Sequence, residues 1–183
     1  MTKVKNLFII QNDYCRFNSL KLSNKGERKM RKVVNFIKSC VGQKEFSIIF
    51  DSNKQWLAES AVLMPGTSYD VHALETFIRH NGNAEKMVAF MDSKSDHENV
   101  ILLTSNKGIM DLITEFKKSR PGSESFYKKL DRAKFTKLKS GRLSFVGIPN
   151  KKIKKGMKRI PSPILLTEEK PAAKISKKVN KVA

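Results

Sequence analysis

The sequence predicts an α/β protein: a three-layer α/β/α sandwich with a mostly parallel central sheet, followed by an extended basic C-terminal tail. Short apolar runs that end in polar residues alternate with longer stretches in which apolar residues recur every three or four positions. This alternation is typical of a parallel sheet covered by helices. Lysine and proline then become frequent, so we expect a globular domain over residues 1–150 and an extended or disordered tail over 151–183.

Four apolar stretches have the composition of buried strands. They cover residues 7–10, 46–50, 99–104 and 142–148. Branched and aromatic residues dominate them, as in strands that are buried on both faces. Polar residues follow the first three stretches, and in α/β proteins ligands bind at the carboxyl edge of the sheet. We therefore expect any ligand site at the ends of these strands.

Helices are expected between the strands. Ser23 has the side chain of an N-cap, and after it apolar residues keep helical spacing to about Cys40, while most basic residues fall on the other face. Residues 51–53 are suited to cap the next helix, and Asp70 another. Further helices are predicted around residues 87–91, 109–116 and 126–130.

Composition argues against several classes of site. No apolar run approaches the roughly 18 residues that cross a bilayer, so a cytoplasmic protein without membrane contact is expected. Cys15 and Cys40 lack CxxC spacing and predict two reduced thiols. The histidines His72, His80 and His97 are scattered. We therefore predict neither a metal site nor a cofactor.

The charge is concentrated near the C-terminus. The chain has 37 Lys and Arg against 17 Asp and Glu, a net charge of +20. Residues 1–116 hold 16 basic and 13 acidic side chains, whereas residues 117–183 hold 21 and 4. A basic arm on a balanced domain favours a phosphate backbone as partner. A solvated tail or an anionic membrane are alternatives, although the tail lacks the amphipathic stripe of a membrane helix.

The predicted nucleic-acid-binding residues are all basic and lie in this C-terminal third. They are Lys128, Lys129, Arg132, Lys134, Lys137, Lys139, Arg142, Lys151, Lys152, Lys154, Lys155, Lys158, Arg159, Lys174, Lys177, Lys178 and Lys181. Phe126, Tyr127 and Phe135 interleave with them, either to stack on unpaired bases or as core anchors. RNA is favoured over DNA, because lysine-rich extensions on a small domain are typical of ribonucleoprotein particles such as the ribosome.

Two segments carry a resemblance to a known family. Residues 22–28, Leu-Ser-Asn-Lys-Gly-Glu-Arg, are similar to the start of the first long helix in the histidine phosphatase (phosphoglycerate mutase-like) superfamily. Residues 101–106, Ile-Leu-Leu-Thr-Ser-Asn, are similar to its second catalytic strand. Together with the order of elements, they make residues 5–149 resemble a short, phosphohistidine-phosphatase-like member.

The resemblance implies that the catalytic residues have been lost. The family uses an Arg-His-Gly motif after the first strand, and this motif aligns with Gln11, Asn12 and Asp13. The second histidine aligns with Asn106, and a phosphate-binding arginine aligns with Gln55 or Trp56. An amide nitrogen is no nucleophile, and a carboxylate repels phosphate. We therefore expect no enzyme activity.

Three functions remain open at this point. The first is a non-catalytic protein that binds RNA in a ribonucleoprotein particle. The alternative is a pseudophosphatase adaptor that binds an acidic protein or a phosphoprotein in signalling, and the third is an active phosphohistidine or phosphoester hydrolase. The amides of Gln11, Asn12 and Asn106 either hold a small ligand or satisfy backbone groups, and residues 107–108 are a weak signal for an anion.

Overall fold

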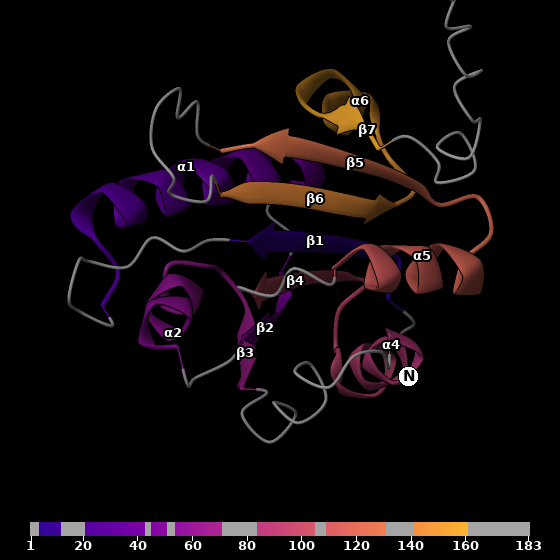
Figure 1. The fold of residues 1–183 in the computed structure, drawn as a ribbon, viewed down its shortest axis with the longest axis horizontal. Helices are drawn as coiled ribbons and strands as arrows, with labels where there is room; N and C mark the ends of the chain where they lie inside the picture. The colour runs from indigo at the N-terminus through magenta and orange to yellow at the C-terminus, as the bar shows by residue number, and fades with distance from the viewer. Residues whose placement is uncertain are drawn as a thin grey trace, which may run out of the picture.

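One mixed sheet organises the protein. The computed structural model describes residues 4–11, 21–42, 45–50, 54–70, 84–104, 109–130 and 141–160. In this part of the chain seven strands form a sheet in the order β3-β2-β4-β1-β6-β5-β7 (Figure 1). The strands are β1 (Asn6–Gln11), β2 (Ser47–Phe50), β3 (Thr67–Asp70), β4 (Asn99–Thr104), β5 (Glu124–Lys129), β6 (Arg142–Gly147) and β7 (Lys158–Arg159).

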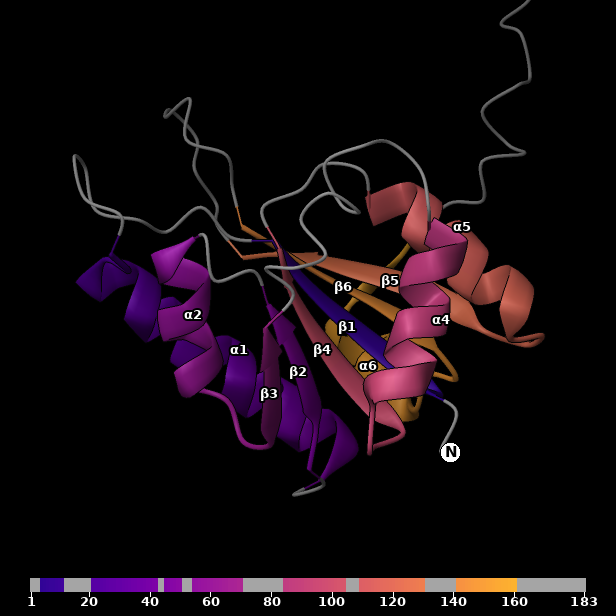
Figure 2. The ribbon, with the colours of Figure 1, turned by 90° about the horizontal axis from the view of Figure 1, so that it is seen from below.

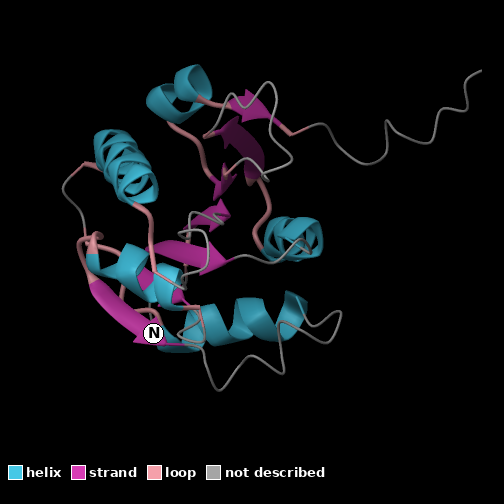
Figure 3. Ribbon diagram, turned by 60° about the vertical axis from the view of Figure 1, so that its left-hand side comes forward, coloured by secondary structure: helices cyan, strands magenta, loops and turns pink. Residues whose placement is uncertain are grey.

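Helices cover both faces of the sheet, as the α/β prediction requires. The described helices are α1 (Asn24–Val41), α2 (Gln55–Val62), α4 (Ala84–Lys94), α5 (Ile109–Ser119) and α6 (Lys151–Gly156). Figure 2 shows α1 and α2 on one side of the strands and α4 and α5 on the other, and Figure 3 shows the same sandwich of helix, strand and helix. The α/β class is therefore confirmed.

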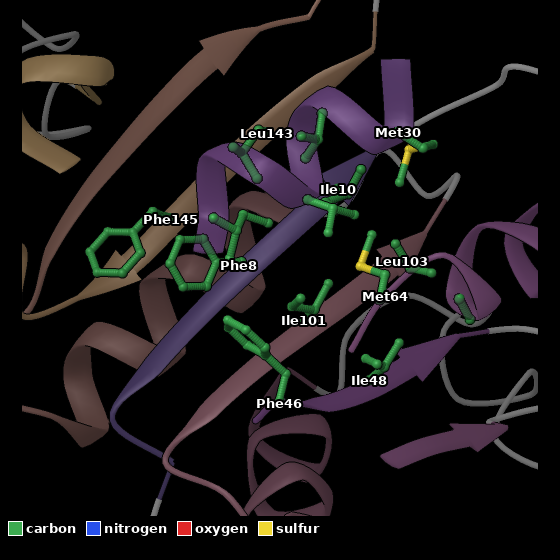
Figure 4. Close-up of a cluster of buried hydrophobic side chains, with 14 of the residues drawn as sticks. Phe8, Ile10, Met30, Phe46, Ile48, Met64, Ile101, Leu103, Leu143 and Phe145 are labelled. Carbon is green, nitrogen blue, oxygen red and sulfur yellow. The ribbon is translucent and has the colours of Figure 1, made fainter. Parts of the chain in front are cut away.

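Strand β1 lies between two hydrophobic cores, one on each face of the sheet. Successive side chains of a strand point to opposite faces. Phe8 and Ile10 accordingly enter the core under α1, α2 and α6, and Leu7 and Ile9 enter the core under α4 and α5. Figure 4 shows the first of these cores, in which Phe8 lies beside Phe145 of β6. Because β1 is buried on both faces, its apolar run predicted it correctly.

The prediction of a mostly parallel sheet is wrong, because the sheet is mixed. Strands β1, β2, β3 and β4 run parallel, but β6 is antiparallel to β1, and β5 is antiparallel to both β6 and β7. The helix predicted around residues 126–130 is also wrong, since residues 124–129 form strand β5. Phe126 lies opposite Phe145 in this pairing and enters the same core. Cross-strand packing of two aromatic residues favours a strand here.

A second difference concerns the chain around β3. Asp70, predicted as a helix N-cap, is instead the last residue of β3, which pairs in parallel with β2. Gly66 has φ of 127°, and a Cβ on it would lie 2.0 Å from the Phe46 carbonyl oxygen. That close approach lets the Thr67 amide donate to the same oxygen (3.1 Å) and start the pairing. The helix expected after Asp70 lies outside the described residues.

The two predicted helix caps have different outcomes. The Ser23 side chain accepts a hydrogen bond from the Gly26 amide (3.0 Å) and caps α1, as predicted. The N-cap of α2 is Lys54, whose side chain makes no capping hydrogen bond. Residues 51–53, which were expected to cap this helix, lie outside the described part of the chain.

The prediction of an extended tail from residue 151 is wrong for its first ten residues. The side chain of Asn150 accepts from the Ile153 amide (3.0 Å) to cap α6, and its Nδ2 donates to the Cys40 carbonyl oxygen (2.5 Å) at the end of α1. Ile153, Met157 and Ile160 are buried. Ile153 and Met157 pack in the core under α1, α2 and α6, and Ile160 packs in the core under α4 and α5. The surrounding lysines obscured these three apolar residues in the sequence. Residues 161–183 lie outside the described residues.

Replacing Asn150 with alanine should lower the free energy of unfolding by about 1–2 kcal/mol, because both a helix cap and a bond to α1 are lost. Urea unfolding measures this change. The Asn150→Asp variant keeps the capping oxygen but loses the amide donor. Its free energy of unfolding should therefore fall only by the contribution of the hydrogen bond to the Cys40 carbonyl oxygen. Wild-type stability of Asn150→Ala would contradict this role.

Candidate nucleic-acid interface

Many of the predicted basic residues gather where β5, β7 and α6 meet, at the top of Figure 1. The described ones are Lys128, Lys129, Arg142, Lys151, Lys152, Lys154, Lys155, Lys158 and Arg159. All of them except the half-buried Arg142 are exposed. The remaining ones, Arg132, Lys134, Lys137, Lys139, Lys174, Lys177, Lys178 and Lys181, lie outside the described residues.

Strand register distributes these residues over two faces. Arg159 of β7 lies opposite Phe126, and Lys158 lies opposite Tyr127. Phe126 belongs to the core under α1 and α6, whereas Tyr127 packs against the core under α4 and α5. Directly opposed residues share a face. Basic side chains therefore project on both sides of the β7 edge.

We call the side that carries helix α6 the α6 surface, with residues Lys128, Lys151, Lys152, Lys154, Lys155 and Arg159. A single carboxylate pairs with two of its members: Glu124 Oε1 lies 3.0 Å from Lys154 Nζ, and Glu124 Oε2 lies 3.8 Å from Arg159 Nη2. Residues 151–160 contain six basic side chains and no acidic one. One carboxylate cannot balance this charge, so the α6 surface is strongly positive.

The α6 surface adjoins the end of α1. Lys128 Nζ lies 4.5 Å from the centroid of the Phe36 ring, and a Cβ on Gly156 would lie 2.6 Å from Phe36 Cε2. Burial raises the pKa of the Cys40 thiol, while a hydrogen bond with Ser39 and the charges of Lys152 and Lys128 partly oppose this rise. Cys40 is thus a buried, protonated thiol. Lys152 and Lys128 lower the pKa of Cys40 because their positive charges lie near the end of α1.

The outer face of α1 extends the positive charge beyond the predicted residues. Lys25, Lys29 and Lys32 follow one another at i, i+4 and i+7, which puts them on one stripe of the helix. The pKa of Lys29 is lowered by burial and then by repulsion from Lys25 and Lys32. The spacing of these lysines was visible in the sequence. Only the packing of α1 and α6 on the same face of the sheet joins the two basic regions.

The degenerate catalytic positions are described only in part. Gln11 ends β1 and lies between Thr104 of β4 and Arg142 of β6 in the register. The carboxyl ends of β1 and β4, two of the predicted strands, therefore lie side by side. Gln55 is exposed on α2, where its Nε2 donates to Glu59 Oε1 (3.2 Å). The other positions, Asn12, Asp13, Asn106 and residues 107–108, lie outside the described residues.

The described residues contain no group of three or more His, Cys, Asp or Glu side chains that could hold a metal ion. His97 lies beside one carboxylate, with its Nε2 3.7 Å from Glu45 Oε2. His72 and His80 are outside the described part. No described helix has both the length and the apolar character to cross a membrane.

The arrangement is suited to binding many phosphates. Ammonium and guanidinium groups form short, charge-assisted hydrogen bonds with phosphate oxygens. Helix α1 alone, at about 1.5 Å per residue, presents its lysines over several turns. A line of cations of this kind matches a polyanion better than a single phosphate group. In comparisons with known proteins, no family model, no curated protein and no solved structure matches this chain.

Proposed function

We propose that this chain is a non-catalytic protein with a histidine-phosphatase-like fold that binds RNA in the cytoplasm, as a component of a ribonucleoprotein particle such as the ribosome. The α6 surface is the observation that carries the proposal. Its six cations are exposed, and two of them, Lys154 and Arg159, pair with the same carboxylate, Glu124. Such a surface supplies the sequence-independent electrostatic part of nucleic-acid binding.

The crowding of like charges supports a polyanionic partner. On α1, Arg31 pairs with Glu27 (2.8 Å), whereas the pKa of Lys29 is lowered first by burial and further by repulsion from Lys25 and Lys32. Like charges at helical spacing destabilise a helix. A phosphate backbone laid along α1 and α6 would relieve this repulsion and release its own bound counterions.

The sequence beyond the described residues supports RNA in a large particle. Residues 161–183 add five lysines, with isolated prolines that prevent a continuous helix. An extended chain can contact many phosphates without a core of its own. Attached next to the α6 surface, at Ile160, such a segment would continue the same line of positive charge.

The second candidate is an adaptor for an acidic protein or a phosphoprotein. Arg142 of β6 lies opposite Gln11, so a positively charged residue lies at the carboxyl end of β1.

A competition experiment with an acidic polymer distinguishes the RNA-binding protein from the adaptor. RNA binding should resist an excess of polyglutamate, whereas an adaptor would bind the acidic polymer equally well. Phosphomonoester hydrolysis that disappears in Asn12→Ala would instead support a catalytic function.

The main test compares the full chain with a chain that ends at Ile160. A stop after Asn150 would be unsuitable, because it removes the buried Ile153 and Met157. The shorter chain should keep its circular dichroism spectrum but bind RNA more weakly. The slope of log affinity against log salt should be less steep for the shorter chain than for the full chain, by about 0.7 for each phosphate contact to single-stranded RNA that is lost. Absence of RNA binding by the full chain at low salt would refute the proposal.

A further inference from the structure

An arginine and a tyrosine stack at the surface of the sheet, on the face opposite the α6 surface. The Arg142 guanidinium carbon lies 4.5 Å from the centroid of the Tyr127 ring. Both side chains are half-buried. Lys129 lies directly opposite Arg142, and Lys158 lies directly opposite Tyr127. The neighbouring strands β6, β5 and β7 thus place two planar groups and two exposed ammonium groups together.

Strand alternation separates the aromatic residues of this region. Phe126 is only 5% exposed and belongs to the core under α1, so it is a core anchor and cannot meet a ligand. Tyr127, the next residue, points to the other face and keeps part of its surface accessible. Phe135 lies outside the described residues. Of the described aromatic residues in the basic region, Tyr127 is therefore suited to contact a base.

Arg142 also has an unused hydrogen-bond donor. Its Nε is buried and has no hydrogen-bond partner among the described residues. A buried donor on a charged group is unfavourable unless an acceptor reaches it. The stack on Tyr127 holds the guanidinium plane in place. Because Nε itself is buried, a bound base or phosphate can reach only the accessible part of the half-buried Arg142 side chain.

We propose that Tyr127, Arg142, Lys129 and Lys158 form a subsite for an unpaired nucleotide of RNA. A base stacks on the Arg142 and Tyr127 pair, and Lys129 and Lys158 contact the flanking phosphates. The inference rests on the proposed RNA binding and specifies its substrate: single-stranded RNA at this subsite. Bases in a duplex are already stacked on one another, so they cannot use such a platform.

The same geometry gives a path for the strand. Lys158 and Arg159 are consecutive and project to opposite faces of the sheet. A strand of RNA bound to the α6 surface can therefore follow phosphate contacts around the short β7 edge to Tyr127. An acidic peptide would satisfy the lysines, but its Asp and Glu side chains carry no aromatic ring to stack on the guanidinium. Charge and stacking together favour the nucleotide.

The test uses the full chain and two labelled RNAs of equal length, a single-stranded oligouridine and a perfect duplex, with affinities measured by fluorescence anisotropy. Tyr127→Leu keeps an apolar side chain at this position, and Arg142→Lys keeps the charge, but each removes one of the two planar groups of the stack. Each should weaken binding of the single strand by about tenfold or more and leave duplex binding within about twofold. Tyr127→Phe should restore single-strand affinity.

Val62→Ala provides a matched control, because Val62 is 83% exposed on α2. It should change neither affinity, and thermal melting should show that every variant is folded. If the wild-type chain binds RNA, the subsite would be refuted by either of two results. Tyr127→Leu and Arg142→Lys would lose affinity equally for the single strand and the duplex, or they would lose no affinity for either RNA. If the wild-type chain binds neither RNA, the proposed function itself fails.

Discussion

Replacing the four lysines of α6, Lys151, Lys152, Lys154 and Lys155, with glutamine should weaken RNA binding by about 10- to 100-fold at physiological salt. All four are exposed, so the loss comes from phosphate contacts and not from the fold. The buried face of α6 and its Asn150 cap are unchanged. The ion pair between Lys154 and Glu124 is partly exposed and contributes at most about 1 kcal/mol to stability.

Filter binding over a range of salt concentrations measures this effect. The slope of log affinity against log salt should fall by about 3, which is about 0.7 for each of the four contacts. A matched control removes the same charge from the other helical layer, with glutamine at Lys86 and Lys94 of α4 and at Lys117 and Lys118 of α5. Equal losses in the two variants would show that net charge alone matters, and would contradict an interface at α6.

Replacing Arg120 with methionine should lower the free energy of unfolding by about 3–5 kcal/mol. Arg120 is 9% exposed, and its Nη2 lies 2.5 Å from Asp92 Oδ1. Its Nε donates to the Val4 carbonyl oxygen, and its guanidinium carbon lies 3.9 Å from the centroid of the Phe116 ring. The Val4 amide donates to the same Asp92 oxygen (3.0 Å). One guanidinium thus connects the start of β1 with α4 and α5.

The large effect arises because the substitution leaves a carboxylate and a carbonyl without their partner. Urea unfolding measures it, and the same loss should shrink when Asp92 is also replaced by leucine, since the unpaired charge is then gone. Arg31→Met is the control: Arg31 pairs with Glu27 on the exposed face of α1, and its loss should cost about 0.5 kcal/mol or less. A loss below about 1 kcal/mol for Arg120→Met would contradict the proposed role.

Prediction of the fold from the sequence succeeded where local patterns and tertiary burial agree. The run at residues 7–10 became β1 because it is buried on both faces, and Ser23 capped α1 because capping needs only neighbouring residues. Residues 124–129 were predicted wrongly. Their two aromatic residues and two lysines carry no clear period, and pairing with β6 decided their conformation.

Prediction of the candidate site was limited in the same way. The basic composition of residues 151–160 was evident, but their helix and strand depend on tertiary packing. Ile153 and Met157 are buried in the core that α1 and β5 help to form, and Ile160 is buried in the core on the other face of the sheet. The basic stripe of α1 was visible as a pattern, yet nothing in the sequence joined it to α6. The resemblance to histidine phosphatases stays a prediction, since no family model matches the chain and Asn12, Asp13 and Asn106 lie outside the described residues.

The sequence by itself determined the α/β class, the position of the central strand and the concentration of positive charge toward the C-terminus, because hydrophobic periodicity and charge are local properties. Only the tertiary structure decided the direction of β5 and β6, the folding of residues 151–160 and the meeting of Tyr127 with Arg142. These features depend on pairing between distant segments. Strand register, which turns alternate side chains to opposite faces, places the basic residues of β5, β6 and β7 on both faces at this edge of the sheet.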